Sequence, residues 1–182
     1  MSLAALFAPK TLNAMALTLG LAASSSAHAI NATGIEFGLG DEHVESVRLN
    51  LRWNWNQYWS LTEQWHASGF WEANIGHIMS KGIGKQNIWD VGFIPTFRLR
   101  SGISRFYLEA GVGAHMLSHD RINDRRELGS KLLFGDRLGF GWNFGEKDQH
   151  EIGYRFLHFS NAHLAKPNDG VNLHLLHLGY NY

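Results

Sequence analysis

Hydrophobic residues alternate with polar or small residues along eight separate segments of this chain, and no other feature constrains the fold as strongly. Successive side chains of a β-strand point to opposite faces, so a period of two gives each strand one apolar and one polar face. The alternating segments are residues 35–40, 47–55, 65–75, 89–99, 106–116, 132–144, 151–156 and 176–182. The alternation predicts an all-β protein.

The number and length of these segments favour a membrane barrel. Many are long enough to cross a bilayer at a tilt, and eight is the smallest common strand count of outer-membrane barrels. Trp and Tyr lie near several segment ends, as in interfacial belts, and the final Tyr182 is in phase with its strand. We therefore predict an eight-stranded antiparallel transmembrane β-barrel with its apolar face outward. An exported soluble β-barrel, with its apolar face inward, is the alternative.

The first 29 residues differ from the rest of the chain. A single Lys10 precedes an uncharged apolar run, which ends in the small-x-small pattern Ala27-His28-Ala29. This pattern is typical of a secretory signal peptide. We expect a signal peptide over residues 1–29 and one barrel domain over residues 30–182, located in the bacterial outer membrane.

Composition excludes several kinds of site. The 16 basic and 16 acidic residues balance, so no nucleic-acid partner is expected, and the absence of cysteine excludes disulfides and thiolate metal sites. Among the 11 histidines, His174 and His177 would point to opposite faces of a strand. His158 and His174 lack a carboxylate in the right phase to complete a site. No metal or cofactor is predicted.

Strand parity predicts the topology. Eight strands place both termini in the periplasm, so residues 118–130 and 161–170 form external loops, and residues 145–149 form a short periplasmic turn. Long loops outside and short turns inside are typical of such barrels.

The apolar phases of the last two strands reach the external rim. Continued along the seventh strand, the phase includes His158 and Ser160, and along the eighth it includes His174 and Asn172. These side chains should face lipid, with His158 and Asn172 as diagonal neighbours. A histidine can take the proton of a serine hydroxyl and make it nucleophilic. By itself, this spacing also fits rim residues that only hydrogen-bond lipid headgroups.

Two short runs in this region carry a family resemblance. HFSNA (158–162) followed by KPNDG (166–170) resembles the active-site hairpin of the PagL-type lipid A 3-O-deacylases, eight-stranded serine esterases of the outer membrane. The resemblance implies Ser160 as the nucleophile and His158 as the general base. It implies Asn168 in stabilising the oxyanion, and Asn161 also matches the pattern.

The hairpin departs from the family pattern at two positions. Asn172 stands where the family usually has a glutamate as the third catalytic member, and His163 stands where a glycine is usual. Asparagine can orient a histidine but cannot stabilise an imidazolium by charge. Either Asn172 fills the third place, or another group such as Asp169 substitutes for the missing carboxylate.

The resemblance also implies the partners. They are lipid A or lipopolysaccharide as substrate and the outer membrane itself, with a homodimer possible. A non-catalytic small outer-membrane barrel, acting in adhesion or membrane integrity, is the functional alternative.

Overall fold

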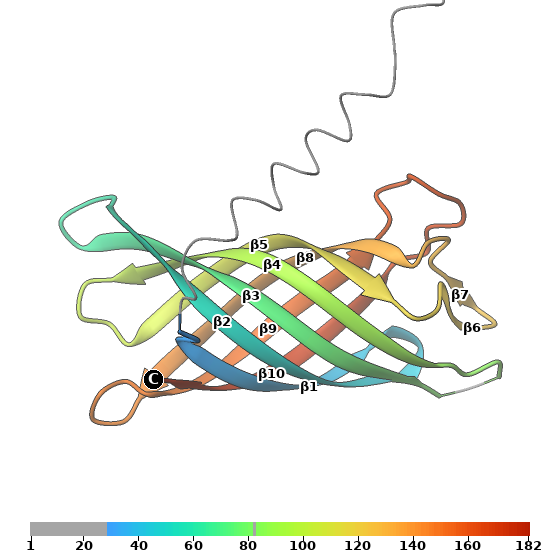
Figure 1. Ribbon diagram of the computed structural model, residues 1–182, viewed down its shortest axis with the longest axis horizontal. Coiled ribbons are helices and arrows are strands. Elements are labelled where there is room, and N and C mark those ends of the chain that lie inside the picture. Colours follow the sequence, from blue (N-terminus) through green and yellow to red (C-terminus); the bar gives the residue numbers. More distant parts are fainter. Residues whose placement is uncertain (1–28, 82) are drawn as a thin grey trace, which may run out of the picture.

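The computed structural model describes residues 29–81 and 83–182, which form a closed antiparallel β-barrel (Figure 1). Around the barrel the strand order is β1-β10-β9-β8-β5-β4-β3-β2, so the first and last strands pair and no edge is left open. The barrel strands are β1 (Ala32–Gly40), β2 (Val44–Ser60), β3 (Trp65–Ser80), β4 (Asn87–Ser101), β5 (Phe106–Leu117), β8 (Leu132–Phe144), β9 (His150–Ser160) and β10 (Val171–Asn181). The predicted fold class is confirmed. The predicted signal peptide lies outside the described residues except for Ala29.

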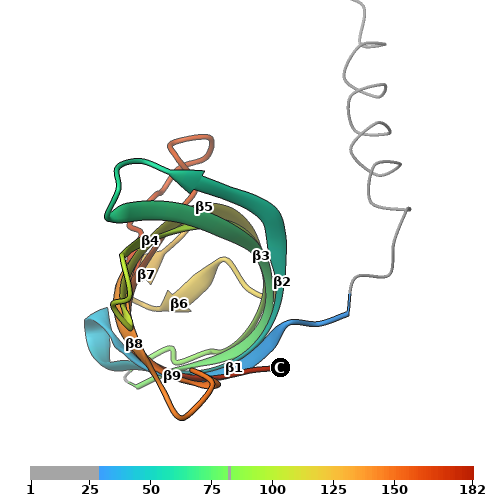
Figure 2. The same ribbon diagram turned by 90° about the vertical axis from the view of Figure 1, so that its left-hand side faces the viewer.

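The external loops contain structure that the sequence did not indicate. A short 3-10 helix, η1 (Asp41–His43), joins β1 to β2, and a hairpin of β6 (Arg121–Asn123) and β7 (Arg126–Glu127) lies between β5 and β8. Seen along the barrel in Figure 2, β6 lies across the far end of the lumen. The three connections at the end that carries both termini are short, as predicted for residues 145–149, and parity assigns this end to the periplasm. In the described residues, no helix is long and apolar enough to span a membrane.

Alternation divides the barrel wall as the sequence predicted. Leucine, valine, phenylalanine and tryptophan side chains are exposed on the outside, where hydrocarbon would cover them. The ladder between β4 and β5 is interrupted at Ile94 and Pro95, although Pro95 still pairs with Trp71 on β3. Proline lacks the N–H that a second ladder would need.

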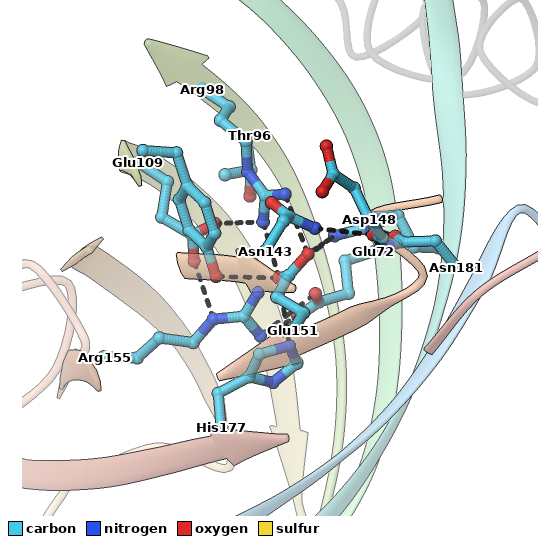
Figure 3. A network of polar contacts seen from close by, with 12 residues as sticks. Glu72, Thr96, Arg98, Glu109, Asn143, Asp148, Glu151, Arg155, His177 and Asn181 are labelled. Carbon is cyan, nitrogen blue, oxygen red and sulfur yellow. Dashed lines mark hydrogen bonds and ion pairs between the residues drawn. The ribbon is translucent and has the colours of Figure 1, made fainter. Parts of the chain in front are cut away.

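The lumen is filled by two layers of side chains. Towards the external end, apolar side chains from the strands pack with Ile122 and Leu128 of the hairpin region, all buried. Beyond them lies a buried network of opposite charges, part of which is seen in Figure 3. Its basic members are Arg48, Arg52, Arg98, Arg137 and Arg155, and its acidic members are Glu36, Glu72, Asp90, Glu109 and Glu151. The numbers of the two signs match, and each of these groups forms an ion pair with at least one group of the opposite sign.

Arg155 shows how tightly this network is joined. Its Nε atom donates to Glu109 at 2.6 Å, and its Nη1 atom donates to Glu36 at 2.6 Å and to Glu72 at 3.1 Å. One guanidinium therefore joins carboxylates from three strands, which makes the barrel a rigid support for the groups on its outer surface.

Candidate active site

His158, Ser160 and Asn172 lie on the outer face of the wall at the external end of β9 and β10. Their neighbours Leu157 and Phe159 point into the lumen and are fully buried, whereas the three polar side chains are half-buried on the outside. The predicted orientation is thus confirmed. Asn172 pairs directly with His158 in the β9–β10 register, not diagonally as predicted. Direct pairing brings the two side chains into hydrogen-bond contact.

The hydrogen bond between His158 and Asn172 fixes the tautomer of the imidazole. His158 Nδ1 lies 2.7 Å from Asn172 Oδ1. The amide nitrogen of Asn172 points the other way and donates to the Asp41 carboxylate at 2.8 Å, so the amide oxygen must face the histidine. Because that oxygen can only accept, Nδ1 carries the hydrogen and Nε2 of His158 keeps a free lone pair.

Ser160 is available to a substrate. It lies two residues beyond His158 on the same face, which places the Cα atoms roughly 7 Å apart along the strand. Its hydroxyl makes no hydrogen bond to another group among the described residues. Catalytic hydrogen bonds are often long in ligand-free enzymes and shorten only when substrate binds.

The two asparagines of the β9–β10 loop have different positions. The Asn161 side chain is buried, and its amide nitrogen donates to the carbonyl oxygens of Leu128, Ala165 and Pro167 at 2.8, 3.0 and 3.2 Å. Asn168 accepts a hydrogen bond through Oδ1 from the Asn161 backbone at 2.9 Å. This contact holds Asn168 while its own NH₂ group makes no hydrogen bond among the described residues.

The backbone directly after Ser160 explains why a glycine is usual there. Ala162 and His163 both adopt left-handed conformations, with φ of 51° and 63°. Glycine adopts this conformation without steric cost, whereas His163 is one of the side chains that tolerate it. The departure at His163 therefore leaves the turn intact.

The β6–β7 hairpin holds the loop in place from the side of the lumen. Arg126 donates to the Gly170 carbonyl at 2.6 Å, and the Glu127 backbone donates to the Asp169 carboxylate at 2.8 Å. Asp169 is thus bound to the hairpin, whereas the hydrogen-bond partner of His158 is Asn172. Asp169, the alternative third member predicted from the sequence, therefore uses its carboxylate in a contact with the β6–β7 hairpin.

Comparisons with known proteins identify the family of the chain. The family model of the lipid A 3-O-deacylases (PagL) matches residues 45–181. The chain belongs to the PagL family. It is 32% identical to the lipid A deacylase PagL of Pseudomonas aeruginosa, over 86% of this chain and 91% of that protein. It is 34% identical to the lipid A deacylase PagL of Bordetella bronchiseptica, over 91% of this chain and 90% of that protein.

A solved structure supports the same assignment. The crystal structure of the outer membrane enzyme PagL matches with a TM-score of 0.74 and 28% identity, covering 83% of this chain and 99% of that one. The predicted family, enzyme class and outer-membrane location are therefore confirmed. A soluble barrel and a non-catalytic barrel, the two alternatives, do not fit membership of the PagL family.

Two carboxylates near His158 were missed by the sequence analysis. Asp41, in η1, accepts hydrogen bonds from both the backbone and the side chain of Asn172, at 3.1 and 2.8 Å. Asp136, on β8, pairs with His158 from the other side and is exposed on the outer wall. Closure of the barrel brings β1 beside β10, pairing Gly40 with Leu173, so the following Asp41 falls next to Asn172. The contact of Asp41 with Asn172 could have been predicted from the strand order around the barrel, which places β1 beside β10.

An apolar groove runs along the outer wall beside these residues. It lies over β4, β5 and β8, where small side chains leave a depression between larger apolar ones. Its lining includes Phe97, Ala110, Gly111, Leu138 and Phe156, with Asp136 at the end near His158. Within the described residues, no three metal-ligating side chains come together.

Proposed function

We propose that Ser160 removes the acyl chain at position 3 of lipid A, with His158 as general base and Asn172 holding the imidazole. The reaction class follows from the family: the chain is a lipid A 3-O-deacylase, a carboxylic ester hydrolase of the outer membrane. The observation that carries the residue assignment is the His158–Asn172 hydrogen bond of 2.7 Å on the same outer face as Ser160.

The reaction proceeds in two steps, acylation of Ser160 and hydrolysis of the acyl-serine. Ser160 Oγ gives its proton to His158 Nε2 and bonds to the ester carbonyl carbon. The bond from that carbon to the sugar oxygen then breaks, and His158 returns the proton to the sugar oxygen. Water attacks the resulting acyl-serine with His158 again as base, which releases the fatty acid and restores Ser160.

Asn168 is our candidate for stabilising the negative charge on the carbonyl oxygen. Its NH₂ group makes no hydrogen bond to another described residue, and its Oδ1 atom is fixed by the Asn161 backbone. A preorganised donor of this kind lowers the barrier because it needs no reorganisation as charge develops. We assign Asn161, whose amide is used on three carbonyls, to holding Asn168 in position.

The outward location suits a lipid substrate. The scissile ester of lipid A lies between its sugar and its acyl chains, at the depth where the external rim meets hydrocarbon. The acyl chain can lie in the groove over Ala110 and Gly111, with Phe97 and Leu138 beside it. Asp136 supplies a carboxylate where this groove approaches His158. A closed pocket is not needed because the bilayer already excludes water from the chain.

The test is mass spectrometry of lipid A from cells that produce the protein. Ser160→Ala should abolish loss of the 3-linked acyl chain, as should His158→Ala, while heat-modifiable migration on gels shows normal barrel assembly. Ser60→Ala, at the exposed periplasmic end of β2, is the matched control and should behave as wild type. Full activity in Ser160→Ala would refute the assignment. The possible homodimer stays a prediction, to be tested by the mass of the detergent-solubilised protein.

A further inference from the structure

The carboxylate of Asp41 is linked to His158 through one intervening side chain, that of Asn172. Its Oδ2 atom accepts hydrogen bonds from the Asn172 backbone nitrogen at 3.1 Å and from the Asn172 side-chain nitrogen at 2.8 Å. The Asn172 side-chain oxygen in turn accepts from His158 Nδ1 at 2.7 Å. The three side chains form one continuous hydrogen-bonded chain that ends in a negative charge.

We infer that Asp41 is a positioning residue of the active site and supplies, through Asn172, the negative charge that the glutamate of the family pattern would supply directly. This inference rests on the proposed function of His158 and Ser160. When His158 takes the serine proton it becomes positively charged. A carboxylate hydrogen-bonded to the far end of the amide polarises that amide, so its oxygen becomes more negative toward the imidazolium.

The other charged groups nearby do not have this arrangement. The Asp169 carboxylate accepts from the Glu127 backbone in the hairpin. Asp136 pairs with His158 in the sheet, but the described hydrogen bond of the imidazole goes to Asn172. Arg126 lies 3.8 Å from the Asp41 carboxylate, and its shorter contact, at 2.6 Å, is to the Gly170 carbonyl. The contacts of the Asp41 carboxylate with Asn172, at 2.8 and 3.1 Å, are therefore shorter than its ion pair with Arg126.

Asp41→Asn removes this charge without removing its hydrogen bonds. The new amide keeps an oxygen that can accept from both nitrogen atoms of Asn172, so the backbone around position 41 should keep its conformation. We expect kcat to fall on the order of 10-fold with KM unchanged, because the charge acts through an amide and beside water. A triad carboxylate that contacts histidine directly accounts for ~10⁴-fold in serine proteases.

A second substitution separates this charge effect from a structural one. Asn172→Glu restores the family residue but places two carboxylates side by side, and like charges at such a distance cannot both ionise easily. We expect Asn172→Glu alone to be less active than the double variant Asp41→Asn/Asn172→Glu. Asp41→Asn should therefore lower activity in the natural background and raise it when Glu stands at position 172.

The experiment measures kcat and KM of the full chain on purified lipid A in detergent micelles. Glu45→Gln is the matched control, because Glu45 lies close to Asp41 in the chain, pairs with the exposed Lys81 and contacts neither His158 nor Asn172. The reversal of sign between the two backgrounds supports the inference. An equal loss in both backgrounds, or no loss in either, overturns it. Failure of the proposed function would appear separately, as an active Ser160→Ala variant.

Discussion

Asn161→Ala distinguishes a side chain that holds the active-site loop from one that contacts the substrate. The amide nitrogen of Asn161 carries two hydrogens and lies within 3.2 Å of three carbonyl oxygens, those of Leu128, Ala165 and Pro167. Leu128 belongs to the buried apolar cluster of the lumen, so its carbonyl has little access to water once the amide is gone. Alanine at position 161 would leave these acceptors without their donor.

The size of the effect follows from the number of hydrogen bonds lost. Two donated hydrogens at a net ~1 kcal/mol each give about 2 kcal/mol, and a carbonyl left buried without a partner adds about 1–3 kcal/mol. We therefore expect the free energy of opening the loop to fall by about 3–5 kcal/mol. Since each ~1.4 kcal/mol is a factor of ten, opening should become at least roughly 100-fold more frequent.

Hydrogen exchange in the loop measures this opening. The Leu164 amide donates to Asn161 O at 3.0 Å and the Asp169 amide donates to Glu127 O at 3.3 Å, so both report loop opening. Both should exchange faster in Asn161→Ala, with deacylation reduced in parallel because Asn168 loses its support. Asn87→Ala, at the exposed start of β4, is the control. Unchanged exchange together with a large fall in kcat would mean that Asn161 acts on the substrate, and our reasoning would be wrong.

Two further variants test the surroundings of the site. Gly170→Ala should lower deacylation at least ~10-fold, because a Cβ there would come within 2.9 Å of His158 Cε1 and displace the base. The control is Gly102→Ala, which has a similar φ of 50° but its nearest neighbour at 3.8 Å, and it should keep activity. Equal activity of the two variants would contradict the argument. Arg155→Met should lower the free energy of unfolding in urea by about 3–5 kcal/mol because it leaves buried carboxylates short of a partner, and a change below ~1 kcal/mol would show that the network tolerates the loss.

The strands and their faces were predictable because alternation is a local property. The period of two runs without a slip along β9, from Ile152 through Phe156 to His158 and Ser160, so the outward orientation of the last two follows from the first. Parity then assigned residues 161–170 to the external side. Neither step needs knowledge of which strands are neighbours.

The supporting contacts of the site were not predictable because they join distant parts of the chain. Asn161 and Asn168 have similar chemistry, and only the packing of Leu128 beneath the loop separates their tasks. The contact between Asp41 and Asn172 spans most of the chain and requires both barrel closure and the register of β1 against β10. The sequence showed the hairpin, whereas the residues that hold it come from two other loops.

The position of Asp41 suggests why an amide is tolerated at position 172. A charged side chain on the lipid-facing wall lowers stability more the deeper it lies, from ~0–1 kcal/mol near the interface to ~2–4 kcal/mol at the midplane for Arg or Lys, and by less for a carboxylate. Asn172 carries no charge on that wall, whereas Asp41 lies in η1 beyond the strand end, with 35% of its side chain exposed. A charge in that loop is hydrated when His158 is neutral, and it still acts through one amide when His158 becomes an imidazolium. With the carboxylate at Asp41 instead of position 172, the protein loses less folding free energy to a charge against lipid. Part of the electrostatic stabilisation of the imidazolium is kept.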